Sequence, residues 1–469
     1  MLLIIPQSNI SSKNYLNKPA ANKHTARLWA FRVFLAIILI CALQNCNTKS
    51  NQPMADRDSI PLVSIPDSLP APYETKSVKN YSKVIGWPDN KMPTAPPGFK
   101  VTKFAEGLQN PRWLYVTSNG DILVAEANTE TKGIKKVTEK ISGKAESQNS
   151  GESANRITLL RDKDNNGVPE LKQVLLFGLN QPFGMLVLGN SLYVANTDGI
   201  IQYPYQPGQT QIKSEGKKIM ALPAGGHNNH WTRNIIANAD LTKIFVSVGS
   251  GSNVGEHGME NEVRRANILE INPDGSGERV YANGLRNPVG MGLAPGTNEL
   301  WTVVNERDEL GDNLVPDYLT RVKEGGFYGW PYAYYGPNED PRLKGQEPDL
   351  VKQTLIPDMS MGAHTASLGL AFYNQKAFPS KYQGGAFVGQ HGSWNRSQLS
   401  GYKVVFIPFR NGKPSGDPED FLTGFIADES KSEVYGRPVG IAVLPDGALL
   451  VADDASNIIW KIQADSLLR

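Results

Sequence analysis

The stretch GLRNPVGMGLAPGTNELWTVVNERD (residues 284–308) carries the pattern that decides the fold. A Gly-Leu-x-x-Pro opening leads into an apolar strand, a tight turn follows at GTNE, and a second apolar strand ends in polar residues. The same plan occurs at five other places: GLQNPRWL (107–114), GLNQPFGM (178–185), NNHWTRNI (228–235), SLGLAFY (367–373) and YGRPVGI (435–441). Six similar units joined by loops of unequal length, with no long helical periodicity, predict an all-β fold, a six-bladed β-propeller.

The composition narrows the class of protein. Hydrophobic residues make up 40% of the 469, which is typical of a globular chain. The 48 Lys and Arg residues nearly balance the 46 Asp and Glu residues, so nucleic-acid binding is not expected. The two cysteines, Cys41 and Cys46, both lie near the N-terminus. The body of the chain therefore has no disulfide framework, cysteine-ligated metal or catalytic cysteine.

The N-terminal 95 residues read as a leader and a tether. Basic residues precede an eleven-residue apolar run, 33–43, which is too short to span a bilayer and is typical of a signal peptide. The run ends in LQNC, so we expect residues 1–46 to be a lipoprotein leader and Cys46 a lipid-anchored residue of an exported, periplasmic or membrane-tethered protein. A simple secretory leader is the alternative. Residues 47–95 are rich in Pro, Ser, Asp and Lys and predict a flexible tether before a propeller over 96–469.

Polar residues end the second strand of each unit, and in a propeller these ends meet at one mouth of the central channel. The ends include Glu126, Asn196, Asn253, Asn305, Glu306, Gln390, His391 and Asp454. Carboxylates, amides and an imidazole gathered there predict a site for a cation, a polar ligand or both. Arginines also recur near the start of the first strand in four units, at Arg112, Arg233, Arg286 and Arg437. Guanidinium groups bind carboxylates, so they predict a planar or polyanionic ligand.

Histidine is scarce, with six residues in the chain, so each can be weighed. His230 lies three residues before Arg233 at the start of a strand. Because an imidazole can accept a hydroxyl proton near neutral pH, we expect His230 to be a general base. A hydrogen-bonded loop histidine is the alternative.

The motifs HWTRN, GLRNPVG, VVNERDELGDNLVPDYLT, GGFYGWPY and GRPVGIAVLPDGALLVADD, in this order over residues 98–465, resemble the glucose/sorbosone dehydrogenase family, and most of all its sorbosone dehydrogenase-like branch. The resemblance implies a six-bladed propeller with pyrroloquinoline quinone (PQQ) and Ca²⁺ at the channel mouth. It implies oxidation of an aldose or sugar aldehyde by hydride transfer to the quinone. The expected partners are a small sugar and an external electron acceptor, and a membrane only through the lipid anchor.

The resemblance also implies roles for particular residues. His230 matches the catalytic base. The residues matching quinone-binding positions are Arg233, Arg286, Asn287, Arg396 and Arg437. The turn matching the calcium site, where backbone oxygens matter most, is Asn305, Glu306 and Arg307. The sequence departs from glucose-oxidising relatives at SGSN after VSVG, at Pro438 and at NERDEL.

Two other functions stay open at this point. A calcium-dependent lactone hydrolase would place Glu126, Asn196, Asn253 and Asp454 around a metal without a quinone. A non-catalytic sugar-binding propeller would need neither. The arginines at the mouth favour the quinone, because a lactone hydrolase needs no anion clamp.

A separate motif, DKDNNGVPE (162–170), lies between two apolar runs. Asp162, Asp164 and Asn166 alternate before Gly167, as in the first half of a calcium loop. Position twelve is Gln173 rather than Glu, so an EF-hand is not supported, and a polar hairpin turn is the alternative.

Overall fold

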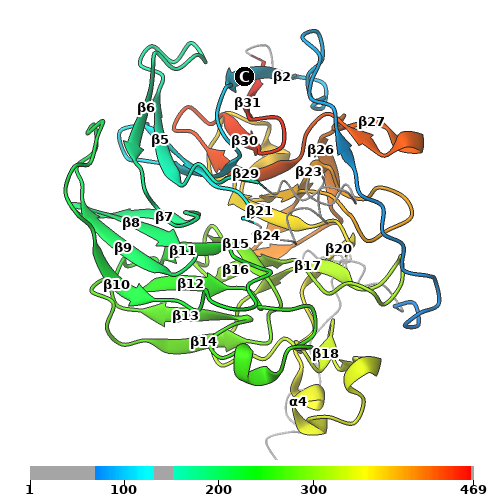
Figure 1. Cartoon of the computed structure of the whole chain (residues 1–469). Coiled ribbons are helices and arrows are strands. Elements are labelled where there is room, and N and C mark those ends of the chain that lie inside the picture. Colours follow the sequence, from blue (N-terminus) through cyan, green and yellow to red (C-terminus); the bar gives the residue numbers. More distant parts are fainter. Residues whose placement is uncertain (1–68, 131–150, 466–469) are drawn as a thin grey trace, which may run out of the picture. The chain divides into compact units, whose positions relative to one another are not determined.

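The computed structural model describes residues 69–130 and 151–465. These lie in the second of two units into which the chain divides, Ile60–Arg469. Within the described residues, six four-stranded sheets form the bulk of the unit, and neighbouring strands in each are antiparallel (Figure 1). The expected leader with Cys46, and the tether up to residue 68, fall outside the described residues.

The six sheets follow the chain closely. The first contains β3 (Pro111–Val116), β4 (Ile122–Glu126), β5 (Arg156–Arg161) and β6 (Leu171–Leu176). The second contains β7 (Met185–Leu188), β8 (Ser191–Asn196), β9 (Gly199–Pro204) and β10 (Lys217–Ala221). The third contains β11 (Arg233–Ala237), β12 (Ile244–Val248), β13 (Asn267–Ile271) and β14 (Arg279–Asn283). The fourth contains β15 (Pro288–Leu293), β16 (Leu300–Val304), β17 (Pro316–Arg321) and β20 (Met359–Ala363). The fifth contains β21 (Ser367–Phe372), β22 (Ala386–Gln390), β23 (Lys403–Ile407) and β26 (Glu419–Leu422). The sixth contains β29 (Pro438–Val443), β30 (Leu449–Asp453), β31 (Ile458–Ala464) and β2 (Phe99–Ala105).

Smaller elements lie between or beside these sheets. The short strands are β1 (Lys83–Val84), β18 (Ala333–Tyr334), β19 (Asn338–Glu339), β24 (Phe409–Arg410), β25 (Lys413–Pro414), β27 (Ile426–Asp428) and β28 (Glu433–Val434). The helices are α4 (Pro348–Gln353) and the 3-10 turns η1 (Met259–Asn261), η2 (Pro341–Leu343), η3 (Ser380–Tyr382) and η4 (Glu429–Lys431). None of the helices in the described part of the chain is both long enough and apolar enough to cross a bilayer.

The first strands of the six sheets contact one another in a closed order: β3, β7, β11, β15, β21, β29 and again β3. Glycines in the repeated openings allow this approach. A Cβ on Gly440 in β29 would lie 2.7 Å from the Arg112 carbonyl oxygen in β3, and one on Gly290 would lie equally close to the Leu368 carbonyl oxygen. The PVG segments that mark the repeat in the sequence are therefore where neighbouring sheets meet backbone to backbone.

The second strand of each sheet is the most deeply buried. Every residue of β4, β12, β16, β22 and β30 is buried. Apolar clusters fill the space between adjacent sheets; Leu186 and Tyr193 of one sheet share a cluster with Ile235 and Val246 of the next. Strands that are buried on both faces have continuous apolar sequences, and the second strands of the repeat have this pattern. The all-β prediction is confirmed.

Residues 69–95 differ from the flexible tether that their composition predicted. Trp87 packs against Trp460 and Phe425, and its Nε1 donates to Asp453 at 2.8 Å. Tyr81 stacks on Trp394, with ring centroids 5.9 Å apart and planes 8° from parallel. We call residues 69–95 the N-terminal arm. Its two tryptophan contacts attach it to the sheets, because aromatic burial outweighs the polar, proline-rich composition.

Candidate active site

A cavity of about 920 Å³ opens where loops from all six sheets meet. Its lining is mostly polar, and includes five of the residues that the resemblance matched to site positions: His230, Arg286, Asn287, Asn305 and Arg437. It also includes Arg112, Asp308, His364 and His391. The cavity is large enough for a cofactor and a small ligand together.

His230 precedes β11 and is held in one tautomer. Its Nδ1 lies 2.9 Å from the Ser250 carbonyl oxygen and 3.0 Å from the Ser250 hydroxyl, and that hydroxyl donates to the Ser252 carbonyl oxygen at 2.6 Å. Because a carbonyl oxygen only accepts, Nδ1 carries the proton and Nε2 keeps a lone pair. Burial, and then the nearby Arg286 guanidinium, lower the pKa of His230 to about 3. The imidazole is therefore a neutral base at physiological pH.

Arg286 is buried beside His230 and joins two loops. Its Nη1 donates to the backbone carbonyl of Glu306 at 2.6 Å and to that of Asn305 at 3.2 Å. Its Nη2 donates to Asn253 Oδ1 at 2.9 Å and to Asp308 Oδ2 at 3.2 Å. The turn that the sequence matched to a calcium site thus offers two of its carbonyl oxygens to a guanidinium. As built, these two oxygens do not fit a cation, since an ion there would have to displace Arg286.

Two buried polar atoms of residues that line the cavity lack a hydrogen-bond partner within the described chain. Asn287 Oδ1 and Arg112 Nε are buried and have no hydrogen-bond partner among the described residues. Both residues line the cavity. Buried polar atoms are rarely left unsatisfied, so an acceptor for Arg112 and a donor for Asn287 are expected from a ligand or water. An anionic, carboxylate-bearing group such as PQQ fits this pair and the flanking arginines.

Opposite charges form a connected group on another part of the wall. Arg112 Nη1 donates to Asp454 Oδ2 at 2.5 Å, and His391 Nε2 lies 2.8 Å from Asp454 Oδ1. Arg437 donates to the His391 carbonyl at 2.9 Å. Burial would raise the pKa of Asp454, but His391 and Arg112 outweigh it and hold that pKa well below its usual range. Burial, and then Arg437, lower the pKa of His391 to about 4, so this imidazole is neutral.

His364 is another of the four histidines that line the cavity, beside His227, His230 and His391. His364 Nε2 donates to the Gly311 carbonyl at 2.9 Å, and Nδ1 lies 3.6 Å from Asp308 Oδ1. Burial alone would lower the pKa of His364, but hydrogen bonding to Asp308 outweighs it and raises the pKa above its ordinary value. The pKa of His364 is therefore raised, whereas the pKa values of His230 and His391 are lowered. Of the two neutral imidazoles, His230 is the one that we expect to accept a proton, through Nε2.

Four residues matched to site positions do not line the cavity: Arg233, Glu306, Arg307 and Arg396. Arg233 is fully buried, where its guanidinium donates to the carbonyls of His230, Thr232 and Pro223. It supports the His230 loop from beneath. Arg307 is also fully buried, with ion pairs to Glu306 and Asp340. Arg396 donates to the Ala363 carbonyl and to Asn313 Oδ1.

Three signals at the site escaped assignment from the sequence. Arg112 belongs to the arginine pattern and His391 to the polar strand ends at the expected channel mouth, but neither has an individual role assigned from the sequence, and His364 has none. His391 follows a buried strand end directly, and Asp454 does the same in the next unit. That shared phase is the signal that could have paired them. His364 has no comparable signal, because it lies in a loop after β20.

The acidic residues of the lactone-hydrolase alternative do not converge on a metal. Glu126 binds the Arg156 guanidinium through both carboxylate oxygens, at 2.9 and 2.8 Å, and accepts from Thr158. Asp454 is engaged by Arg112 and His391. Both carboxylates are thus neutralised by protein cations, and Glu126 does not line the cavity.

Comparison with known proteins identifies the family. A model described as TrAA12-like matches residues 93–318 and 346–465. The chain belongs to the TrAA12-like family. The described fold agrees with this assignment: the PQQ domain of pyranose dehydrogenase from Coprinopsis cinerea, solved in its holo form, superposes with a TM-score of 0.63 at 21% identity, covering 82% of this chain and 100% of that domain.

Curated relatives of this TrAA12-like chain include three proteins. An uncharacterized protein of Borreliella burgdorferi is 32% identical over 303 residues, covering 62% of this chain and 77% of the relative. The aldose sugar dehydrogenase YliI of Escherichia coli is 33% identical over 247 residues, covering 52% of this chain and 56% of the relative. The PQQ-dependent pyranose dehydrogenase of C. cinerea is 22% identical over 431 residues, covering 78% of this chain and 54% of the relative. The chain thus spans little more than half of the two named dehydrogenases. The homologues and structural neighbours with named activities are sugar dehydrogenases, among them PQQ-dependent ones, and the matching family model is TrAA12-like, which confirms the family resemblance seen in the sequence.

Proposed function

We propose that this protein oxidises an aldose or related sugar aldehyde in a six-bladed propeller, with PQQ as its cofactor. The observation that carries the proposal is His230: a neutral imidazole lines a 920 Å³ cavity, with its proton fixed on Nδ1 by Ser250. The closed order of the six sheets supports the propeller, and the relatives named as sugar dehydrogenases support the reaction class.

The residues that would hold the cofactor are the arginines that line the cavity together with Asn287. Arg112 and Arg437 lie on one part of the wall, and Arg286 and Asn287 on another. Their guanidinium groups suit carboxylates, and Asn287 Oδ1 suits a donor. When bound, PQQ would supply the two-electron acceptor for the sugar's hydride. A calcium ion at Asn305, Glu306 and Arg307 is not part of this proposal, because Arg286 occupies the first two carbonyls.

His230 performs the proton step. Nε2 accepts the hydroxyl proton of the sugar as the C–H bond at the same carbon breaks. Nδ1–H keeps donating to the Ser250 carbonyl oxygen throughout, so the ring keeps its orientation. Arg286, next to the imidazole, disfavours the charged form and so favours return of the proton to solvent or acceptor.

Reconstitution tests this function. Purified protein is incubated with PQQ and Ca²⁺, and its absorption spectrum is recorded before and after addition of aldoses, with an artificial electron-accepting dye as a second readout. Reduction of the bound quinone by an aldose is the expected result. A quinone that binds but is never reduced by any aldose would leave the non-catalytic alternative in place.

The cellular setting is proposed from the sequence. An exported, lipid-anchored protein would meet small sugars and an external electron acceptor outside the cytoplasm. The leader and Cys46 that motivate this idea lie outside the described residues.

A further inference from the structure

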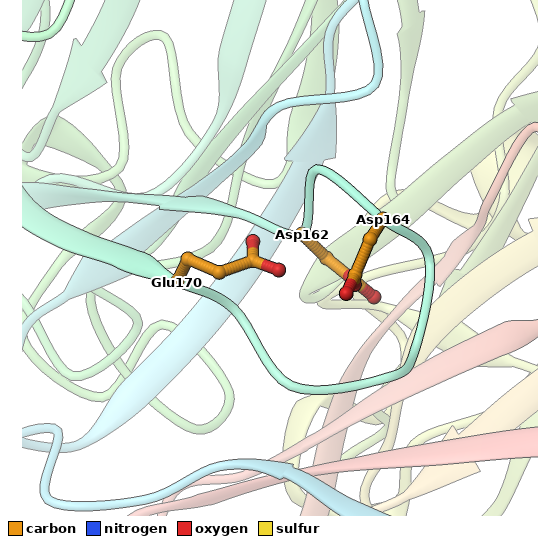
Figure 2. A group of neighbouring side chains, drawn as sticks. All are labelled: Asp162, Asp164 and Glu170. Atoms are coloured by element: carbon orange, nitrogen blue, oxygen red, sulfur yellow. The ribbon is translucent and has the colours of Figure 1, made fainter.

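The hairpin between β5 and β6 carries a cluster of three carboxylates that the active site does not use. Asp162 and Asp164 come directly after β5, and Glu170 comes directly before β6. One carboxylate oxygen of each lies within 4.8 Å of the others. Figure 2 shows the carboxylates of Asp162 and Asp164 side by side, with that of Glu170 pointing toward them. None of the three lines the active-site cavity.

Asp162 is the residue that points to a ligand. Its side chain is only 6% exposed, which is rare for a carboxylate. Oδ2 accepts from the Gly167 backbone N–H at 2.9 Å, whereas Oδ1 is buried and has no hydrogen-bond partner in the part of the chain that the structure describes. A buried, unpaired carboxylate oxygen is costly, so a positive partner is expected for it.

The protein supplies little of that positive charge. Lys461 Nζ lies 3.9 Å from Asp162 Oδ2, at the limit of an ion pair, and is closer to Asp446, at 3.4 Å. The Asp162 oxygen that is already hydrogen-bonded is the one nearer the lysine. Asp162 therefore shares this ammonium group with Asp446, while the nearby carboxylates of Asp164 and Glu170 add negative charge that repels its own.

The backbone of the loop holds the acidic oxygens in place. Asp164 Oδ1 accepts from the Asn166 N–H at 3.1 Å, and Glu170 Oε2 accepts from the Lys163 N–H at 2.7 Å. Gly167, with φ of 91°, makes the reversal that lets its N–H reach Asp162. Asp162 and Glu170 are thus each fixed through one oxygen. Asp164 also accepts from Asn166 Nδ2 through Oδ2, at 2.9 Å, so a cation would share the Asp164 carboxylate with that amide.

We propose that this hairpin binds a calcium ion through Asp162 Oδ1 and the carboxylates of Asp164 and Glu170. All three ligands are hard carboxylate oxygens. Such ligands favour hard cations such as calcium over the softer metals that bind thiolates and imidazoles. The loop is open on its Asp164 side, where water can complete the coordination, and calcium tolerates such irregular geometry better than magnesium does. This site is independent of the function proposed above.

Calcium titration of the full-length, quinone-free protein tests the proposal. After removal of metal with a chelator, calorimetry with CaCl₂ counts the ions bound per chain. The double variant Asp164→Asn/Glu170→Gln is expected to bind one ion fewer than the wild type and to lose the rise in Tm that Ca²⁺ gives. The matched control is Asp274→Asn, in the turn of the β13–β14 hairpin, which should bind as many ions as the wild type. Equal stoichiometry in the double variant and the wild type would overturn the site.

A measurement on the unaltered protein guards against a variant that misfolds. Lys163 is exposed within the loop, so trypsin can cleave after it. Calcium at the proposed site should slow cleavage at Lys163 at least several-fold, with magnesium at the same concentration having less effect. A cleavage rate that Ca²⁺ leaves unchanged would also overturn the proposal.

Discussion

The Arg286 guanidinium donates to the backbone carbonyl of Glu306 at 2.6 Å, and this bond ties the residue matched to the quinone to the turn matched to calcium. The same side chain reaches Asn253 and Asp308 and lowers the pKa of His230. One buried arginine thus links the proposed base, the proposed cofactor site and the loop after β16. Mutations there will act on all three, which makes matched controls essential.

Substituting Arg286 should weaken cofactor binding. Loss of a buried, charge-assisted clamp costs about 2–4 kcal/mol, so Arg286→Ala should raise the Kd for PQQ by roughly 30- to 1,000-fold. Arg396→Ala is the control, because Arg396 is half-buried and does not line the cavity. Fluorescence titration with PQQ measures both. Equal weakening in the two variants would remove Arg286 from the cofactor site.

Substituting His230 should abolish the proton step while the cofactor still binds. General-base catalysis contributes about two to four orders of magnitude, so His230→Ala should lower kcat by that factor. His257→Ala, altering an exposed histidine that does not line the cavity, should retain much more activity. Steady-state kinetics on the quinone-loaded proteins make the comparison. A kcat for His230→Ala near the wild-type value would contradict the assignment.

The pH profile should carry the mark of the lowered His230 pKa. A base with a pKa of about 3 stays deprotonated as the pH falls through neutrality. The value of kcat/KM should therefore show no acid limb near pH 6.5, where an unperturbed histidine would be half protonated, since its pKa is about 6.5. Kinetics between neutral pH and the onset of acid unfolding check this. If an acid limb does appear near pH 6.5, the His364→Asn variant shows which histidine causes it. A limb that disappears in His364→Asn belongs to His364 and leaves the prediction standing. A limb that persists in His364→Asn would contradict the prediction.

Asp454 should matter for stability as well as for the site. Asp454→Asn leaves Arg112 buried without its carboxylate and should cost about 3–5 kcal/mol in the free energy of unfolding. Because the folded pKa is depressed, the carboxylate stabilises the fold fully above its unfolded pKa of about 3.9. That contribution is lost only as the pH falls through the folded pKa. The difference between variant and wild type should thus be constant over mildly acidic to neutral pH. Asp428→Asn, in an exposed ion pair, is the control for urea unfolding.

The predicted lipid attachment at Cys46 can be tested by cell fractionation. If residues 1–46 are a lipoprotein leader, the native protein should enter the membrane fraction and Cys46→Ser should become soluble or stay unprocessed. Two or more acyl chains hold a protein stably on a bilayer, so a clear partition is expected. Soluble native and variant proteins sharing one cleaved N-terminus beyond residue 46 would favour a simple secretory leader.

The repeat made the sheets predictable, because its glycines and apolar runs are required by local packing. Gly290 and Gly440 appear in the sequence as PVG and in the structure as backbone contacts between sheets. The third and fourth strands were predicted only in the first sheet, where the apolar runs on either side of DKDNNGVPE are β5 and β6. In the other sheets these strands do not share a repeated sequence pattern. His230, Arg286 and Arg437 line the cavity, and their roles there stay predictions.

Arg233 and Arg307 show why the remaining site residues could not be assigned. Both sit at strand ends like Arg286, but their guanidinium groups turn toward backbone carbonyls of neighbouring loops. Which way a long side chain turns depends on where those loops place their carbonyls. That geometry arises only from the folded loops, whose lengths and conformations the sequence pattern did not specify. The same holds for the packing of Trp87 that fixes the N-terminal arm.

The pairing of β2 with β31 has a consequence for how the chain is made. Among the six sheets, β2 is the first strand to leave the ribosome and β31 is the last. Until synthesis ends, β2 lacks its neighbour and presents an open edge to other nascent chains. A chain stopped early by a nonsense codon would keep that edge permanently, so even short C-terminal truncations should produce aggregates rather than slightly less stable enzyme.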